Sequence, residues 1–462
     1  MGLGLHGGGL EAARFFLKRG AETVITDLRD EKKLEPTIAK LETYTRDMGG
    51  KPARYVLGGH EIADFKNADI VIKNPAVRPD SPFLQAARRV ETDISIFLRE
   101  SPARLFAVTG TKGKSFTSSA LHRILGTRGN AFLGGNITVS PLSFLEELKK
   151  DDDVVLELSS FQLGDLKDRK AENGEALLKP DSALITSIMP DHLDRYASME
   201  EYVDDKKHIF RGQDAGGITI AYDDAWGRSF LNETKARALA CSNIPPPAGK
   251  SGGWLAGGAF ARLYGFPGIP EEKIELFPRD IPAPGECQKM NALFAALAAF
   301  ASGIKEEKIR DALSDFRGIE HRMELFLEKD GTRFYNDSAA TIPQAAAACV
   351  EALSPLGDLI LVTGGTDKNL DFTPLARAAA KAKDVILLEG SGSEKLMSLL
   401  KDAGVSFSGP FNDLDKAAAL AIAKAAKGGV VALSPGCASF GMFLNEFDRG
   451  RRWKETVSRY VD

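Results

Sequence analysis

The chain has 462 residues, of which 43% are hydrophobic and 27% are charged, and its formal net charge is −4. This length predicts two or three domains, and the charge gives no sign of a nucleic-acid or membrane surface. The four cysteines lack CxxC spacing, and there is neither a signal peptide nor an apolar run of about eighteen residues. We therefore expect no zinc site, no disulfide framework and no membrane insertion, in a reducing cytoplasm.

Short runs of β-branched residues alternate with helical stretches, which predicts an α/β fold with largely parallel sheets. We expect three domains: a Rossmann-like domain over 1–98, a central P-loop ATPase-like domain over 99–318, and a second Rossmann-like domain over 319–462. The expected strands are 23–27, 68–76, 104–110, 154–160, 182–189, 333–338, 358–365, 384–390 and 429–436. A long alanine-rich helix is expected at 290–303, and the Pro-, Gly- and Ser-rich stretch 242–258 is expected to be a surface excursion.

The first glycine loop places Gly2, Gly4 and Gly7 in the spacing GxGxxG, and Asp27 stands 20 residues after the last of them. Such a loop holds a dinucleotide pyrophosphate, and an acid at this distance binds the ribose of NAD, so a dehydrogenase is one hypothesis. The motif requires a strand before it, and only Met1 stands there. The hypothesis also leaves everything after residue 98 unexplained.

The strongest motif is VTGTKGKS, in which an apolar strand ends at Gly110 and a helix follows the loop. Glycines allow backbone N–H groups to face a phosphate, and the helix N-terminus adds the positive end of its dipole. Lys114 would reach the β- and γ-phosphates of a nucleotide, and the Ser115 hydroxyl would bind Mg²⁺. The loop is shorter between its glycines than GxxxxGK[ST], and the alternative interpretation is a lysine-rich surface turn.

An acid that could fix the metal follows in VVLELSSFQ, where Glu157 ends an apolar strand. A carboxylate flanked by Leu156 and Leu158 is costly to bury without a cation to pair with. The alternative is a glutamate that faces solvent from a half-exposed strand. The phosphate loop upstream favours the metal interpretation.

A third cluster holds Asp191, His192 and Asp194 just after the strand 182–189. Open α/β sheets bind ligands at the carboxyl ends of their strands, so this histidine is a candidate for a metal or substrate contact. Lys206 lies fourteen residues after the histidine, in an expected amphipathic helix that begins near Ser198.

Together these motifs resemble those of the Mur ligases, over a span from Gly2 to about Arg449. The stretches that carry the resemblance are GTKGKS (110–115), ELSSFQL (157–163), DHLDRY (191–196) with the lysine of YVDDK, HRME (321–324), NDSAAT (336–341), GGTDKN (364–369) and SPGCASF (434–440). ELSSFQL and SPGCASF are the more specific, since ATP-dependent Mur ligases share the phosphate loop with folylpolyglutamate synthases. In this order the motifs are most similar to those of the members that add D-glutamate.

The resemblance implies ATP and Mg²⁺, with two metal sites. Position by position, it implies an ATP site of Gly110, Thr111, Lys112, Gly113, Lys114, Ser115, Asn291, Arg322 and Asp337. It implies the metal ligands Ser115, Glu157, His192 and Lys206, and the catalytic residues Lys114, Glu157, His192 and Lys206. The family carries a side-chain carbamate at the position of Lys206, which turns a cation into an anionic oxygen ligand. Lys207 is adjacent, but the spacing from His192 favours Lys206.

The same resemblance implies that the UDP-linked substrate binds to Leu5, His6 and Asp27 of the first domain and to Asn136 of the central domain. It implies that Thr341, Lys368, Ser439 and Phe440 of the third domain hold the amino acid. The implied reaction joins D-glutamate to UDP-N-acetylmuramoyl-L-alanine through an acyl phosphate, for peptidoglycan precursor synthesis. We expect a cytoplasmic monomer without a nucleic-acid partner.

Three places depart from the family's pattern. Ala339 stands where a lysine is common, and Cys287 and Gln288 replace a histidine and an asparagine before the alanine-rich helix. Glu446, with Phe447 next to it, stands where an aromatic residue is expected, which bears on amino-acid specificity. A Mur ligase of another specificity and a folylpolyglutamate synthase-like ligase are therefore the alternatives. The glycine-loop domain disfavours the second, because the synthases lack it at their N-terminus.

Relatives in this family also carry an apolar strand before the glycine loop. We therefore expect that the start codon is miscalled or the chain shortened, and that the first sheet lacks a central member.

Overall fold

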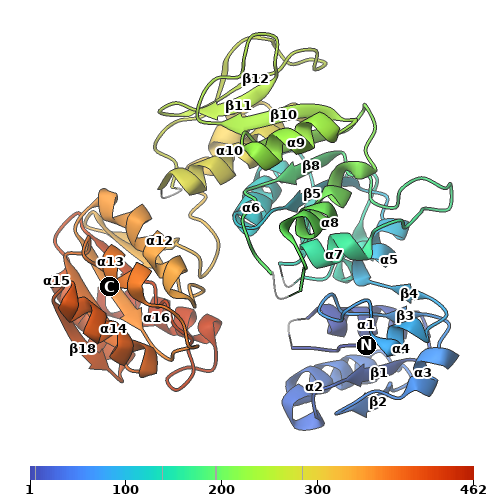
Figure 1. Cartoon of the computed structure of the whole chain (residues 1–462), viewed down its shortest axis with the longest axis horizontal. Helices are drawn as coiled ribbons and strands as arrows, with labels where there is room; N and C mark the ends of the chain where they lie inside the picture. Colours follow the sequence, from blue (N-terminus) through green and yellow to red (C-terminus); the bar gives the residue numbers. More distant parts are fainter. Residues whose placement is uncertain (6, 138, 193–194, 283–284, 462) are drawn as a thin grey trace. The chain divides into compact units, whose positions relative to one another are not determined.

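The computed structural model describes residues 1–5, 7–137, 139–192, 195–282 and 285–461, and Figure 1 shows their elements along the chain. The chain divides into two compact units. The first unit holds Met1–Arg279 and Met290–Ala312, and the second holds Asp280–Lys289 and Leu313–Asp462. The predicted domain bounds near residues 98 and 318 stay a prediction.

The first hundred residues of the first unit form two separate two-stranded parallel sheets, β1–β2 and β3–β4. Their elements are α1 (Gly8–Lys18), β1 (Val24–Asp27), α2 (Glu31–Asp47), β2 (Arg54–Leu57), α3 (Ile62–Asn67), β3 (Val71–Ile72), α4 (Pro82–Gln85), β4 (Val90–Glu91) and α5 (Asp93–Glu100). Helix α2 begins where the Asp30 side chain accepts from the Lys33 amide, and α5 begins at a capping box of Thr92 and Ser95.

The rest of the first unit is built on a nine-stranded sheet in the order β13-β12-β11-β10-β9-β8-β5-β7-β6. Its strands are β5 (Arg104–Thr109), β6 (Ala131–Gly135), β7 (Asp153–Glu157), β8 (Ser182–Ile185), β9 (Ile218–Tyr222), β10 (Arg237–Ser242), β11 (Gly252–Leu255), β12 (Ala259–Arg262) and β13 (Ile274–Phe277). The helices over this stretch are α6 (Lys114–Leu125), α7 (Ser160–Asp165), α8 (Met199–Arg211), α9 (Ala225–Glu233), α10 (Gly285–Ala301) and α11 (Glu306–Ser314). The first five residues of α10 and the last two of α11 belong to the second unit. All neighbours from β6 to β11 are parallel, whereas β11–β12 and β12–β13 are antiparallel.

The apolar runs in the sequence form the buried central strands of this sheet. Every residue of β7 and β8 is buried, and so are the last five residues of β5. Strands covered on both faces read as continuous apolar runs, as parallel strands in α/β proteins do. The predicted surface excursion at 242–258 is wrong in part, because Gly252–Leu255 form the buried strand β11 and pair with β10. Trp254 supplies the apolar surface that the Pro- and Gly-rich composition concealed.

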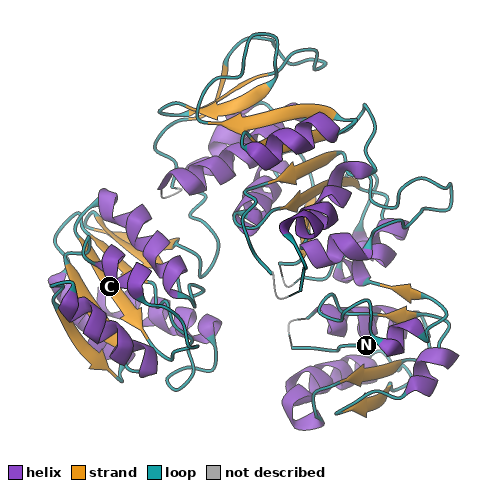
Figure 2. Ribbon diagram, viewed as in Figure 1, coloured by secondary structure: helices purple, strands orange, loops and turns teal. Residues whose placement is uncertain are grey.

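The second unit has a six-stranded sheet in the order β14-β15-β19-β16-β17-β18, in which only β14 is antiparallel to its neighbour. Its elements are β14 (Glu324–Lys329), β15 (Thr332–Asn336), α12 (Pro343–Leu353), β16 (Leu359–Gly364), α13 (Thr373–Ala379), β17 (Asp384–Leu388), α14 (Ser391–Asp402), β18 (Phe407–Phe411), α15 (Leu414–Lys424), β19 (Val430–Leu433) and α16 (Glu446–Val461). One core packs α12, α13 and α14 on one face, and another packs α15 and α16 on the other. Figure 2 shows the sheet between these helices.

The predicted α/β fold with mostly parallel sheets is therefore confirmed. Among the described residues, no helix is both long and apolar enough to cross a bilayer.

Candidate active site

Four of the predicted motifs follow four neighbouring strands of the nine-stranded sheet. The loops begin after β6, β7, β5 and β8, which lie side by side and run parallel. Parallel neighbours present their carboxyl ends at the same edge of a sheet, where open α/β sheets bind ligands. The sheet therefore brings GGN, ELSSFQ, GTKGKS and the residues after 185 to one edge.

The phosphate loop depends on the small size of its two glycines. A Cβ at Gly110 would lie 1.9 Å from Thr186 Oγ1, and a Cβ at Gly113 would lie 2.3 Å from Asn291 Oδ1. Both glycines also have positive φ angles, of 144° and 88°. These close approaches place the Asn291 side chain, from α10, against the loop that precedes α6. Ser115, the second residue of α6, is half-buried there.

Two lysines from different helices converge on one carbonyl of this loop. Lys114 Nζ donates to the Gly110 carbonyl at 3.0 Å, and Lys206 Nζ donates to the same oxygen at 2.9 Å. Lys206 is only 2% exposed, and burial together with the charge of Lys114 lowers the pKa of its amine well below the usual value. The neighbouring Lys207 instead pairs with Glu233 at 2.7 Å. The Lys206 amine therefore loses its proton more readily than the amine of an exposed lysine.

Glu157 is 1% exposed, so the interpretation in which it faces solvent does not hold. Its Oε1 accepts from Asn136 Nδ2 at 2.9 Å, whereas its buried Oε2 has no hydrogen-bond partner among the described residues. An unpartnered buried carboxylate oxygen is costly unless a cation binds it. This oxygen fits a Mg²⁺ ligand. Within the described residues, His, Cys, Asp and Glu side chains alone form no group of three that could hold a metal.

His192 lies after β8 in a left-handed backbone conformation, with φ of 54°. Its ring packs 4.9 Å from the Phe161 ring, which belongs to the ELSSFQ helix α7, and 6.4 Å from the Tyr202 ring of α8. Asp191 Oδ2 lies 3.4 Å from Lys112 Nζ of the phosphate loop. The predicted Asp194 lies outside the described residues.

The first glycine loop contacts Asp27, the acid at the position that binds a ribose in the GxGxxG motif. Asp27 is 4% exposed, and its carboxylate accepts from the backbone amides of Gly4 at 3.0 Å and Arg29 at 2.9 Å. Leu5 is exposed beside this loop, and the predicted His6 lies outside the described residues. The acid thus holds the loop in place through main-chain contacts.

The remaining predicted residues lie in the second unit, after three neighbouring parallel strands. NDSAAT follows β15, SPGCASF follows β19 and GGTDKN follows β16. Asp337 is buried, and its carboxylate accepts from Ser434 Oγ at 2.6 Å and from the Met323 amide at 3.1 Å. Burial raises the pKa of Asp337 to about 6. Arg322, which precedes Met323 in the sequence, is exposed.

The four residues predicted to bind the amino-acid substrate differ in their exposure to solvent. Lys368 and Phe440 are exposed, Thr341 is half-buried and Ser439 is 5% exposed. Two backbone hydrogen bonds between Thr366 and Ala438 join the loop of Lys368 to the loop of Ser439. A cation and a hydroxyl that can hold a dicarboxylate are thus carried on two joined loops.

Arg449 is a buried residue that sequence reasoning did not single out. Its guanidinium donates to Ser338 Oγ and O, at 2.9 and 2.8 Å, and twice to the Cys437 carbonyl, at 3.2 Å. It therefore ties the NDSAAT loop to the SPGCASF loop. Its partners are 111 and 12 residues away in the sequence, so no local pattern predicts these contacts.

Comparison with known proteins defines the class. Residues 108–299 match the Mur ligase middle domain, and residues 321–437 match the Mur ligase, glutamate ligase domain. A crystal structure of MurF ligase from Thermotoga maritima in complex with ADP is similar in fold, with a TM-score of 0.56 at 16% identity, covering 98% of each chain. The fold and both matches define a protein built from Mur ligase domains.

Full-length relatives narrow the class. A protein named UDP-N-acetylmuramoylalanine–D-glutamate ligase from Treponema pallidum (strain Nichols) is 39% identical, with 99% of this chain and 96% of the relative covered. A protein of the same name from Roseiflexus sp. (strain RS-1) is 38% identical, with 100% and 98% covered. The chain belongs to the Mur ligase family, in the group of the UDP-N-acetylmuramoylalanine–D-glutamate ligases.

Proposed function

We propose that this chain is an ATP-dependent, ADP-forming ligase that joins D-glutamate to UDP-N-acetylmuramoyl-L-alanine in peptidoglycan precursor synthesis. The full-length relatives carry this name, and the motifs from Gly110 to Ser439 supply groups for each substrate. The observation that carries the proposal is the convergence of Lys114 and Lys206 on the Gly110 carbonyl. The same sheet edge bears the Glu157 oxygen that has no hydrogen-bond partner among the residues that the structure describes.

The first step is the activation of the acceptor. Its carboxylate oxygen attacks the γ-phosphorus of ATP, and the bond from this phosphorus to the β,γ-bridging oxygen breaks. ADP leaves, and the acceptor becomes an acyl phosphate. Lys114 and the amides of the glycine loop bind the phosphates and offset the charge that develops on the transferred group. Asn291 stands against the same loop and is assigned to the adenine side, with Arg322 and Asp337 as contacts to phosphate and ribose.

Lys206 serves this step in a modified form. Burial lowers the pKa of its amine, and the neutral amine can add to CO₂ and release a proton, which leaves a carbamate with two oxygens. This carbamate, Ser115, Glu157 and His192 would hold Mg²⁺ in two sites. Bound Mg²⁺ supplies charge neutralisation on the phosphoryl oxygens. A bare ammonium in the same place would repel the metal.

The second step takes place with the amino acid held by the second unit. The neutral glutamate amine attacks the acyl carbon, and its nitrogen loses a proton. The bond from this carbon to the phosphate oxygen then breaks, and inorganic phosphate leaves from the tetrahedral intermediate. Lys368 attracts a carboxylate, and Thr341, Ser439 and the backbone near Phe440 hold the substrate in place. Leu5, His6, Asp27 and Asn136 are assigned to the UDP-linked substrate. A single chain carries every one of these groups, so we propose a monomer, acting in the cytoplasm where ATP and the UDP-sugar are made.

Trapping the acyl phosphate tests this proposal. ATP, the UDP-linked acceptor and hydroxylamine are incubated with the chain without any amino acid, and the acceptor hydroxamate is measured by mass. We expect the hydroxamate from the natural chain and from Lys235→Ala, because Lys235 is exposed and lies outside the phosphate loop, and none from Lys114→Ala. Hydroxamate that forms equally with Lys114→Ala would contradict the role of this lysine, and its absence from all three chains would contradict the acyl phosphate.

A further inference from the structure

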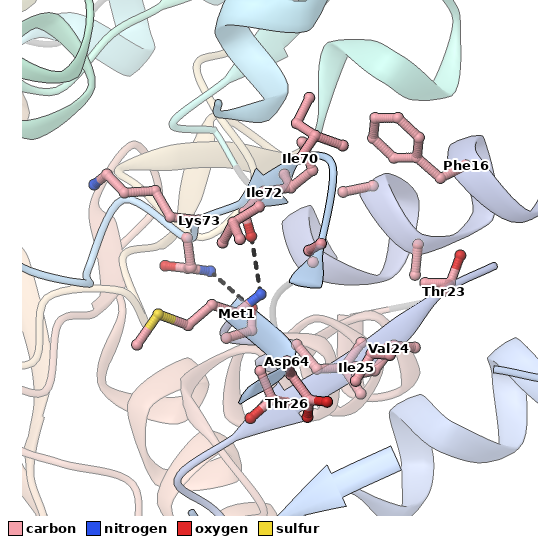
Figure 3. Close-up of a pocket in the computed structure, with 18 of the residues that line it drawn as sticks. Met1, Phe16, Thr23, Val24, Ile25, Thr26, Asp64, Ile70, Ile72 and Lys73 are labelled. Carbon is pink, nitrogen blue, oxygen red and sulfur yellow. Dashed lines mark hydrogen bonds between the residues drawn. The ribbon is translucent and has the colours of Figure 1, made fainter. Parts of the chain in front are cut away.

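The loop of residues 73–77, which follows β3, packs against the start of the first glycine loop. The Asn74 amide donates to the Met1 carbonyl at 3.0 Å, and a Cβ at Gly2 would lie only 2.8 Å from the Asn74 Cβ. Figure 3 shows Lys73, the first residue of this loop, with its side chain pointing away from β1. The loop therefore has the glycine loop on one side and presents Lys73 to another part of the unit.

Lys73 joins this loop to helix α7. Its Nζ donates to the Val77 carbonyl at 3.0 Å, which closes the loop, and lies 2.6 Å from Asp165 Oδ2 at the end of α7. The two charged side chains are only 3% and 4% exposed. An ion pair this deeply buried is a costly way to gain stability, because apolar side chains of similar volume often do as well or better. Stability alone therefore does not explain the pair.

Arg195 makes a second connection between the same two parts. Its guanidinium donates to the carbonyls of Pro75 and Ala76, at 3.5 and 3.4 Å, and its central carbon lies 3.8 Å from the centre of the Phe161 ring. Phe161 belongs to α7, and the His192 ring packs 4.9 Å from the same ring. Both connections therefore end at the helix that supports His192.

The proposed function assigns a substrate to each end of this connection. The glycine loop is assigned to the UDP-linked acceptor, and the sheet edge with Lys114, Glu157 and His192 is assigned to ATP and Mg²⁺. For the acyl phosphate to form, the acceptor carboxylate must lie about 3–3.5 Å from the γ-phosphorus, and a misplacement of about 1 Å can lower the rate by about 10²-fold. The distance between the glycine loop and α7 therefore affects the rate even when both substrates are bound.

We propose that Lys73 is a positioning residue for the acceptor. Through Asp165 it holds the loop of residues 73–77, and with it the glycine loop, at one fixed place relative to α7 and His192. Because the ammonium is buried, it acts through the loop rather than by contact with either substrate. This inference rests on the proposed function and adds to it a residue that lies outside the motifs at the sheet edge.

The double change Lys73→Met with Asp165→Leu tests the proposal, because it removes both charges and leaves neither one buried alone. Phosphate release from ATP gives kcat and the KM values for the UDP-linked acceptor and for ATP, and urea unfolding shows whether the chain remains folded. We expect kcat to fall about tenfold or more while both KM values stay within about twofold, because binding is kept and alignment is lost. The matched control, Lys381→Met with Glu351→Leu, removes an exposed ion pair of the second unit and should leave kcat unchanged. A natural kcat in the first double variant, or a rise in KM without a fall in kcat, would overturn the proposal.

Arg195→Met provides a second variant, because this half-buried side chain can be changed without leaving a buried charge behind. It removes the two hydrogen bonds to the loop of residues 73–77. We expect the same pattern, a lower kcat with unchanged KM values, but a smaller effect because the connection through Lys73 remains. An unchanged kcat, or a rise in KM alone, would count against the proposal.

Hydrogen exchange tests the fixed loop without any substrate. In the natural chain the Val77 amide donates to the Asn74 carbonyl at 3.0 Å. Lys73→Met with Asp165→Leu should speed exchange at Val77 by about tenfold or more and leave exchange in the buried strand β5 unchanged. Equal exchange at Val77 in the two chains would overturn the proposal. This readout uses neither ATP nor the acceptor, so a natural chain that releases no phosphate would contradict the proposed function alone.

Discussion

Lys73 Nζ lies 2.6 Å from Asp165 Oδ2, and the two side chains are only 3% and 4% exposed. Lys73 follows β3, and Asp165 ends the helix α7 that follows Glu157. Arg195, three residues after His192, also donates to the carbonyls of Pro75 and Ala76 in the loop after β3. The buried pair therefore joins the loop after β3 to the helix that carries Phe161, next to His192.

This pair predicts a strong and asymmetric effect on stability. Lys73→Met leaves Asp165 as a buried carboxylate without its cation, which should lower the free energy of unfolding by about 3–5 kcal/mol. The double change Lys73→Met with Asp165→Leu should recover most of this loss. Denaturant unfolding of the three chains measures both quantities. As a control, Lys179→Met breaks the exposed contact to Asp214 and should change little. Single and double variants that are equally destabilised would contradict the pair's role.

Lys206→Ala should lower kcat by about 10²-fold or more, because the charge stabilisation assigned to its carbamate is lost. Added short carboxylates such as formate or acetate should restore part of the rate, since they can occupy the space of the missing oxygens. The matched control is Lys207→Ala, whose side chain pairs with Glu233 at 2.7 Å and should retain activity. Full activity of Lys206→Ala without any carboxylate would show that the carbamate has no role.

Arg449→Met should raise KM for the amino acid by about tenfold or more and destabilise the second unit, because the Ser338 and Cys437 carbonyls lose their donors. Arg451, exposed on the same helix, provides the control Arg451→Met, which should leave KM unchanged. The readouts are KM for D-glutamate against KM for ATP, and the unfolding transition. A rise in both KM values to the same extent would indicate general damage rather than a loosened amino-acid loop.

Asp337 predicts a dependence of stability on pH. Its pKa in the fold is about 6, above the usual value near 4, so the folded state binds more protons between these limits. The free energy of unfolding should therefore fall as pH rises from about 4 to 6, by up to about 3 kcal/mol from this group. Asp337→Asn should remove this part of the slope. Urea unfolding of the two chains across this pH range measures the effect. Identical slopes of the unfolding free energy against pH would contradict the raised pKa of Asp337.

The sequence predicts local elements well where one stretch of residues decides the outcome. The strand, glycine loop and helix around Gly110 follow from the apolar run and the helix start, and the helix at Lys206 begins at its Ser198 cap as expected. At 242–258, composition concealed the strand that Trp254 anchors, because pairing with β10 decides the structure there.

Contacts between distant residues were beyond prediction. Neither the pair of Lys73 and Asp165 nor the four hydrogen bonds of Arg449 has a local pattern, since each joins loops far apart in the sequence.

The central claim is the ligase reaction with its two specific substrates. It is tested most directly by inorganic phosphate release from ATP, measured across acceptors and across D- and L-amino acids. We predict release only when UDP-N-acetylmuramoyl-L-alanine and D-glutamate are both present, despite Glu446 in place of an aromatic residue. Turnover with a folate and no UDP-sugar, or a preference for another amino acid, would contradict the claim.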